Sequence, residues 1–171
     1  MFEHVGVNNY AVYFDCLKKL LKPGGRALVH TIGRSDGPGF TNPFISRYIF
    51  PGGYFPALSE VLPVIEQSGL VTCDIEVLRL HYAKTLRAWR ERFVANWDEA
   101  ARRHDERFCR MWEFYLAGAE MGFRHHGLVV FQILVAHDVE SVPITRDFIA
   151  EREAELEWSA MPPRPVRIAG E

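Results

Sequence analysis

The sequence contains few cysteines and no long apolar run. Only three of its 171 residues are cysteine, Cys16, Cys73 and Cys109, and no two of them form a CxxC pair. A disulfide framework and a zinc site are therefore not expected, and a reducing cytoplasm is the expected compartment. No apolar run reaches the roughly 18 to 20 residues that a helix needs to span a membrane.

The chain also lacks a large net charge. Its 20 lysines and arginines nearly balance 22 aspartates and glutamates, which leaves a formal net charge of −2. Such a balance gives no strong electrostatic attraction to nucleic acid, so no nucleic-acid partner is expected. His125–His126, and His104 with Cys109, match the spacing of no standard metal site, so we predict no bound metal.

Apolar residues, by contrast, are plentiful. They make up 48% of the chain and include twelve phenylalanines and four tryptophans. This content is enough to build a hydrophobic core. The many large rings indicate either large apolar pockets or simply a bulky core.

The apolar pattern predicts an α/β chain. Residues at helical spacing predict a first helix over 8–22, which "KPGG" ends. The further predicted elements are a buried strand at 26–32, a short helix at 59–69 with Ser59 as its N-cap, a strand at 71–80, two long helices at 83–104 and 105–125, a strand at 127–137 and a helix near 145–158. Three strands are fewer than a doubly wound sheet normally has, so we expect the chain to be an incomplete part of such a fold.

Several segments together resemble one protein family. They are, in chain order, "MFEHVG", "LKPGG", "HTIG", "PFISRYIFPGGYFPALSEV", "HYAKTLRAWRERF" and "RFCRMWEFYLAGAEMGFR". The sequence from residue 1 to about residue 137 resembles the C-terminal half of the cyclopropane-fatty-acyl-phospholipid synthases, whose family includes the mycolic acid cyclopropane synthases. "RYIFPGG" and the "HYAKTL" segment are specific to this family, whereas "LKPGG" occurs across many class I methyltransferases.

The resemblance implies a fold class. It is the C-terminal half of a class I S-adenosylmethionine (SAM)-dependent methyltransferase, an α/β Rossmann-like fold, here with a helical insertion. Residues 1–137 would form this portion of the domain, and residues 138–171 would form a charged C-terminal extension. The glycine-rich SAM loop of such a fold is absent, because no GxGxG follows a strand. We therefore expect the chain alone to bind SAM poorly or not at all, with its cofactor-binding residues unknown.

The implied activity is methyl transfer from SAM to the cis double bond of an unsaturated phospholipid acyl chain, which then closes to a cyclopropane. In this family a bound bicarbonate accepts the proton that the carbocation loses. A glutamate, a histidine, a tyrosine, a backbone amide and a cysteine from the N-terminal half hold the bicarbonate in this family. The first four correspond here to Glu3, His30, Tyr82 and the amide of Ile32, and the cysteine has no counterpart in this sequence. A cysteine that many members carry after the "YL" of the second long helix is Ala119 here.

Each of the three side chains in this set also has a plain structural interpretation. Glu3 alone would be a disordered carboxylate at a chain end. His30 in "LVHTIG" would be a core histidine with satisfied hydrogen bonds. Tyr82 would cap a strand with its ring in the core.

Aromatic residues are the candidates for an acyl-chain pocket. They come from the segment 44–55 and from the second long helix. The predicted lining residues are Tyr48, Phe50, Tyr54, Phe114 and Tyr115. Aromatic stripes more often form core than a lipid pocket, so both interpretations stay open.

The resemblance also implies where the protein would act. Its partners would be phospholipid acyl chains at the membrane surface, so a cytoplasmic protein peripheral to the inner face of the membrane is expected. A separate N-terminal half or a homo-oligomer could complete the fold. Two alternatives stay open: another class I SAM-dependent methyltransferase of lipids or small molecules, and a non-catalytic remnant that binds lipid or a partner.

Overall fold

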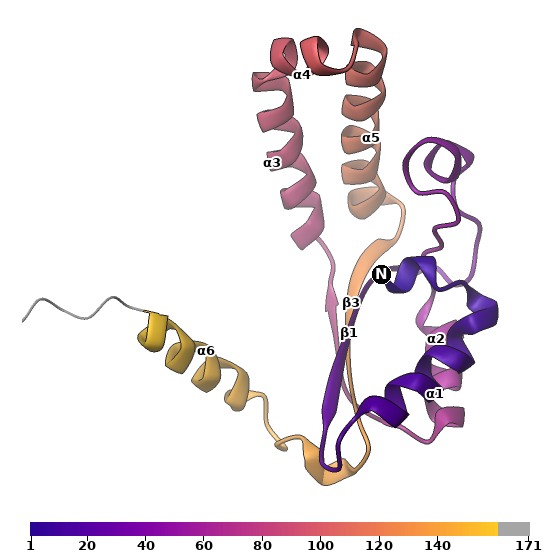
Figure 1. Ribbon diagram of the computed structural model, residues 1–171, viewed down its shortest axis with the longest axis vertical. Helices are drawn as coiled ribbons and strands as arrows, with labels where there is room; N and C mark the ends of the chain where they lie inside the picture. The colour runs from indigo at the N-terminus through magenta and orange to yellow at the C-terminus, as the bar shows by residue number, and fades with distance from the viewer. Residues whose placement is uncertain (161–171) are drawn as a thin grey trace, which may run out of the picture. The chain divides into compact units, whose positions relative to one another are not determined.

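The computed structural model describes residues 1–160, which belong to two compact units (Figure 1). The first unit, Met1–Ser141, carries the sheet and most of the helices. Its elements are η1 (Phe2–His4), η2 (Val7–Asn9), α1 (Tyr10–Leu20), β1 (Arg26–Arg34), η3 (Ile45–Ile49), α2 (Leu58–Ser68), β2 (Val71–Leu78), α3 (His81–Ala95), α4 (Trp97–Arg103), α5 (Glu106–His125), β3 (Leu128–Ala136) and η4 (Val139–Ser141). The second unit begins at Val142, and its described part contains α6 (Asp147–Ala160). The predicted order of helices and strands is confirmed, except that α3 and α4 stand where one helix was predicted.

The three strands form one antiparallel sheet in the order β1-β3-β2. The central strand β3 pairs with β1 without interruption, from Arg26↔Ala136 to Arg34↔Leu128. It pairs with β2 on its other side, with an irregularity in register just after Thr72. Because β3 has a neighbour on both sides and packs on both faces, its sequence "LVVFQILVA" is almost wholly apolar.

One face of the sheet packs against α1 and α2, which lie beside each other in Figure 1. Phe14 of α1 and Ile65 of α2 are fully buried here, together with Phe131 and Ile133 of β3. Successive strand residues point to opposite faces, so Val130 belongs to a different core. The first core therefore covers only one face of the sheet.

The second core joins the other face of the sheet to a helical hairpin made by α3 and α5. Leu86 of α3 and Leu116 and Phe123 of α5 are buried with Val130 of β3. Figure 1 shows α3 and α5 side by side, with α4 across the ends far from the sheet. This hairpin, inserted between β2 and β3, is the helical insertion that the sequence predicts.

The predicted N-cap of α2 is wrong. The helix begins at Leu58 and its N-cap is Ala57, so Ser59 lies inside the first turn. The Glu60 carboxylate accepts a hydrogen bond from the Ala57 N–H at 2.8 Å. A carboxylate at the third helical position thus satisfies the free backbone donor, and no Ser cap is needed.

The predicted helix at 83–104 is also wrong, because it is two helices. α3 ends at Ala95, and α4 begins at Trp97. Between them the Asn96 side chain donates to the Arg92 carbonyl at 2.8 Å. An asparagine that bonds the backbone in this way competes with the helical hydrogen bonds and favours a break.

Two features are absent from the described part of the chain. No helix within residues 1–160 is both long enough and apolar enough to cross a membrane. The same residues contain no group of three or more His, Cys, Asp and Glu side chains that could hold a metal ion.

Candidate functional site

A cavity of about 610 Å³ lies where β1, the loop after it, η3, α3 and α5 meet. Its lining is mostly apolar and aromatic, which is typical of small-molecule sites. The lining residues are Ile32, Arg34, Phe40, Thr41, Asn42, Phe44, Ile45, Phe50, Tyr54, Phe55, Tyr82, Phe114, Tyr115, Gly118, Ala119, Gly122, Phe123, His126 and Leu128.

Aromatic rings in edge-to-face contact form much of the cavity wall. The ring centroids of Phe44 and Phe114 are 5.1 Å apart, and those of Phe50 and Tyr115 are 6.0 Å apart. These contacts tie the irregular segment around η3 to α5, although the two are far apart in the sequence. Four of the five predicted pocket residues line the cavity: Phe50, Tyr54, Phe114 and Tyr115.

Tyr48, the fifth predicted pocket residue, is not in the cavity lining. Its side chain is half exposed, and its ring centroid lies 5.6 Å from that of Phe44. Phe44 lines the cavity and Tyr48 packs against it. The sequence could not separate the two, because η3 is a π-helix turn whose spacing follows neither an α-helix nor a strand.

Small residues of α5 leave space for the cavity. A Cβ atom built on Gly118 would meet no heavy atom within 4 Å. Ala119 and Gly122 lie on the same lining, and a Cβ on Gly122 would come within 2.8 Å of the Leu128 side chain. A larger side chain at position 118 would therefore extend into the open volume rather than into the core.

Glu3 is held in place beside this cavity. Its Oε1 accepts a hydrogen bond from the Ile32 N–H at 2.7 Å, and its side chain is only 16% exposed. Burial alone would raise the pKa of the Glu3 carboxyl, but two influences outweigh it: the backbone hydrogen bonds, that from Ile32 first, and the Met1 ammonium, which donates to Oε2 at 3.0 Å. The net pKa therefore lies below its usual value, and the group is ionised at neutral pH. The interpretation of Glu3 as a disordered carboxylate is wrong.

Tyr82 brings a phenol to the cavity wall. It is the second residue of α3, so it does not cap a strand, and its ring packs on Phe123 at 5.2 Å between centroids. Burial raises the pKa of Tyr82, and the negative charge of Glu3 raises it further. Burial, together with Tyr82, also raises the pKa of Tyr115 to about 12. Both phenols thus stay protonated at neutral pH.

His30 lies apart from the other members of the predicted set. It is exposed on β1 and is not in the cavity lining. Its Nδ1 lies 3.2 Å from the Gln132 Nε2, on the neighbouring strand. The structure thus brings Glu3, Ile32 and Tyr82 together without His30, and His30 is not a core histidine either.

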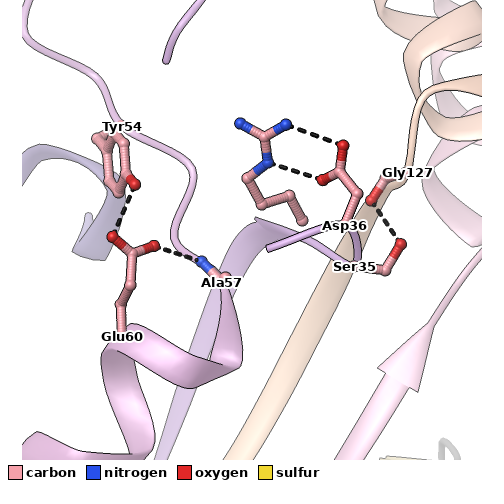
Figure 2. A network of polar contacts seen from close by, with 7 residues as sticks. Ser35, Asp36, Tyr54, Ala57, Glu60 and Gly127 are labelled. Atoms are coloured by element: carbon pink, nitrogen blue, oxygen red, sulfur yellow. Dashed lines mark hydrogen bonds and ion pairs between the residues drawn. The ribbon is translucent and has the colours of Figure 1, made fainter. Parts of the chain in front are cut away.

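A polar edge of the cavity escaped the sequence analysis. Arg34 lines the cavity, and its Nε and Nη2 donate to the Asp36 carboxylate at 2.8 and 2.9 Å. Figure 2 shows Asp36 close to Gly127, whose carbonyl accepts from Ser35 Oγ at 3.1 Å. The sequence offered one signal for it, an arginine two residues after the end of the predicted strand at 26–32.

Figure 2 also shows a second polar link near this edge. The Tyr54 hydroxyl donates to Glu60 Oε1 at 2.8 Å, and the other oxygen of Glu60 accepts from the Ala57 N–H. Burial and the hydrogen bond to Glu60 raise the pKa of Tyr54. The link fixes the segment after η3 to the start of α2, so that Tyr54 faces the cavity from a rigid base.

Comparison with known proteins places these features in one family. The family model described as mycolic acid cyclopropane synthetase matches residues 1–133. The chain belongs to this family. The resemblance that the sequence motifs predicted is thereby confirmed.

The relatives of this cyclopropane synthase family member are methyltransferases. The cyclopropane-fatty-acyl-phospholipid synthase of Escherichia coli K12 is 38% identical over 82% of this chain and 37% of its own length. The tuberculostearic acid methyltransferase of Mycobacterium tuberculosis is 42% identical over 77% of this chain and 32% of its own length. The chain therefore spans about a third of these two relatives.

A solved structure confirms the fold class. The mycolic acid cyclopropane synthase CmaA1, complexed with SAH and CTAB, superposes with a TM-score of 0.71 at 29% identity. The match covers 78% of this chain and 52% of that chain. The small antiparallel sheet and its helices are accordingly part of the Rossmann-like fold of a SAM-dependent methyltransferase.

Proposed function

We propose that this chain supplies the acyl-chain pocket of a SAM-dependent lipid methyltransferase that cyclopropanates the cis double bond of an unsaturated phospholipid. One observation carries the proposal. The aromatic cavity of about 610 Å³ lies beside an ionised carboxylate, Glu3, and a protonated phenol, Tyr82. The family membership and the names of the relatives support it.

The cavity suits a hydrocarbon chain because its walls are rings held in fixed contact. Each methylene group that leaves water for such a site contributes about 0.8 kcal/mol. The alkene is a weak nucleophile, so the main task of the pocket is to hold it in one orientation. The paired rings of Phe50 and Tyr115, together with those of Phe44 and Phe114, form rigid walls for this purpose.

The charges near the cavity suit a cationic intermediate on the acyl chain. Glu3 is ionised at neutral pH, and a negative charge in a partly buried site stabilises a developing cation. Aromatic faces, such as those of Tyr82 and Tyr115, add a smaller attraction for positive charge. The pocket thus stabilises the cation against attack by water. It also offers no thiol at position 119, because Ala119 stands where many members of the family have a cysteine.

A bicarbonate ion fits this arrangement poorly. The Ile32 amide donates to Glu3, and His30 lies outside the cavity lining. Of the predicted set, only the Tyr82 hydroxyl lines the cavity as a side-chain donor. Bicarbonate as the proton acceptor therefore has the support of the resemblance alone, and we assign no step to it.

SAM is the expected methyl donor, since the relatives are methyltransferases and the similar structure carries SAH. SAM supplies an already activated methyl group. The chain contains no GxGxG pattern after a strand, so its residues do not form a SAM site of the usual kind. We propose that residues outside this sequence hold SAM, from the remainder of the fold or a second chain. Isothermal titration of the chain with SAM should show little or no binding.

We propose that the protein acts at the membrane surface on the cytoplasmic side, where phospholipid acyl chains are found. The exposed rings near the cavity support a lipid partner, because Phe40, Phe114 and Tyr48 present large apolar surface to solvent. A partner chain or a second copy is a further proposal, and analytical ultracentrifugation tests it.

Oleate binding tests the acyl pocket directly. Trp112 packs on Tyr115 with 5.1 Å between ring centroids, so tryptophan fluorescence should report occupancy of the cavity. Gly118→Phe places a ring in the open volume and should weaken oleate binding at least about tenfold. The matched control is Ala95→Phe, at an exposed end of α3, which should bind oleate like the wild type.

The outcome separates the pocket from a non-specific apolar surface. Equal oleate affinity in the wild type and both variants would show that the cavity does not hold the acyl chain. A second candidate function, methyl transfer without ring closure, is favoured by the name of the tuberculostearic acid methyltransferase. Mass spectrometry of the acyl chains before and after hydrogenation distinguishes a cyclopropane from an alkene that carries a methylene or methyl group.

A further inference from the structure

The polar edge of the cavity carries one positive and one negative side chain next to each other. Arg34 lines the cavity with its side chain 22% exposed, and Asp36 is 52% exposed. Their hydrogen bonds use only Nε and Nη2 of the guanidinium, which has five N–H donors in all. Arg34 can therefore donate to a further anion while it still contacts Asp36.

Several backbone contacts hold this pair in a fixed place. The Arg34 N–H donates to the Pro56 carbonyl at 3.0 Å, and the Ser35 N–H donates to the Gly127 carbonyl at 2.9 Å. The guanidinium lies against Gly39, in the space that a Cβ at position 39 would take. The backbone that carries the pair is thus fixed between the segment before α2 and the segment before β3, and the Arg34 side chain, 22% exposed, packs against Gly39.

Other polar groups lie on the same lining. Asn42 accepts the Phe44 N–H through its side-chain oxygen at 2.8 Å, which leaves its NH₂ group available as a donor. His126, directly before Gly127, also lines the cavity. The cavity is therefore amphipathic: aromatic rings form most of its wall, and Arg34, Asn42 and His126 add polar atoms to it.

We propose that the Arg34–Asp36 pair binds the headgroup of a zwitterionic, ethanolamine-type phospholipid whose acyl chain occupies the aromatic part of the cavity. Arg34 would donate to the phosphate, and Asp36 would accept from the ammonium group. This inference rests on the proposed lipid substrate and adds the class of headgroup to it.

The charge balance at the edge favours this class over an anionic lipid. The Arg34 guanidinium holds the pKa of Asp36 below its ordinary range, so the carboxylate is ionised at neutral pH. A zwitterionic headgroup offers one opposite charge to each member of the pair. A headgroup with a phosphate and no cation leaves Asp36 facing a like charge, which weakens binding.

Single-chain lipids that share one oleoyl chain test the headgroup separately from the chain. The full 171-residue protein is titrated with lyso-oleoyl-phosphatidylethanolamine, lyso-oleoyl-phosphatidylglycerol, oleate and free phosphoethanolamine, with tryptophan fluorescence and equilibrium dialysis as readouts. The ethanolamine lipid should bind about tenfold more tightly than the glycerol lipid, the effect of one charge-assisted hydrogen bond. Phosphoethanolamine alone should not bind measurably, because it lacks the acyl chain.

Variants of the pair provide the decisive comparison. Asp36→Asn should abolish the preference for ethanolamine over glycerol, Asp36→Lys should reverse it, and Arg34→Gln should weaken both lipids while sparing oleate. Arg87→Gln, which breaks an exposed ion pair on α3, is the matched control and should change nothing. Far-ultraviolet circular dichroism checks that each variant keeps its fold.

The four ligands distinguish failure of this inference from failure of the proposed function. Equal binding of oleate and both lyso-lipids by the wild type would overturn the headgroup assignment and leave the acyl pocket intact. A preference that persists in Asp36→Asn would overturn it too, as would binding of free phosphoethanolamine as tight as that of its lipid. No binding of any oleoyl compound would instead refute the proposed function.

Discussion

Glu3 ties the N-terminal segment to β1, and two substitutions separate the effect of its charge from that of its hydrogen bond. Oε1 accepts the Ile32 N–H at 2.7 Å from a side chain that is 16% exposed, and Oε2 pairs at 3.0 Å with the exposed Met1 ammonium, a contact that both substitutions remove alike. A hydrogen bond to a charged group contributes about 1.5 to 3 kcal/mol, and a neutral one about 0.5 to 1.5 kcal/mol. Glu3→Gln keeps an oxygen for Ile32, so it should lower the free energy of unfolding by about 1 kcal/mol. Glu3→Ala leaves a partly buried N–H unpaired and should lower it by about 2 to 3 kcal/mol.

The pH dependence of the same pair has a definite sign. The pKa of Glu3 lies below its ordinary 4.5 in the folded chain. The carboxylate therefore stabilises the fold at pH values above 4.5, and this contribution is lost as the pH falls through the lower, folded pKa. The gap in unfolding free energy between the wild type and Glu3→Gln should be widest near neutral pH and should close in acid.

Urea titrations followed by circular dichroism, at neutral pH and well below 4.5, measure these differences. Glu91→Gln serves as the control, because Glu91 pairs with Arg87 on an exposed helix face and should change stability by less than about 0.5 kcal/mol. Two results would refute the reasoning. One is a Glu3→Gln variant as stable as the wild type at every pH, and the other is a Glu3→Ala variant no less stable than Glu3→Gln.

Four further predictions concern side chains around the sheet and the cavity. The buried Tyr10 hydroxyl has no hydrogen-bond partner among residues 1–160, so Tyr10→Phe should raise the free energy of unfolding by about 1 kcal/mol. Tyr54→Phe loses a 2.8 Å bond to a carboxylate and should lower it by about 1 kcal/mol, as thermal melts would show. Gly33→Ala puts a Cβ 2.4 Å from a phenylalanine ring and should cost about 2 to 3 kcal/mol in urea titrations, whereas Gly118→Ala meets open space and should cost nothing. Burial raises the pKa of Tyr115 from 10.0 to about 12, so its phenolate absorbance should appear at a higher pH than that of an exposed tyrosine. The free energy of unfolding should fall as the pH rises between these two values, because the unfolded chain loses this proton first. Titration of Tyr115 at its ordinary pKa of 10.0 would contradict its burial.

The strands and most helices followed from apolar spacing, and the misplaced boundaries have local causes. The strand predicted to end at residue 32 continues to Arg34, because Gly33 fits between Phe131 and the Pro56 carbonyl where no Cβ could. Glycine in a sequence suggests a loop, so the predicted strand ended two residues early. This close approach involves Phe131 and Pro56, both more than twenty residues away in the sequence. The spacing of apolar residues around Gly33 carries no information about such distant contacts.

The sequence predicted the residues of the candidate site that lie in family motifs. It did not predict the residues that only tertiary packing brings to the cavity. Glu3 and Tyr82 carry family motifs, and the structure holds both near Ile32. Arg34 belongs to no motif, and it lines the cavity only because β1 extends beyond residue 32. His30 shares a strand with Ile32, but strand geometry alone does not bring it into the cavity.

Glu3 and Tyr82 illustrate how one small site holds two acidic groups in opposite states. Burial disfavours the charged form of both groups, and it raises the pKa of Tyr82 without compensation. At Glu3 the Ile32 amide and the other donors overcome burial, so the carboxylate stays charged. Its charge in turn keeps the nearby phenol protonated, because two negative charges would repel. The backbone hydrogen bonds and the Met1 ammonium thus keep Glu3 charged, and the charge of Glu3 helps to keep Tyr82 protonated. Removal of that charge, in Glu3→Ala or in Glu3→Gln, should therefore lower the pKa of Tyr82.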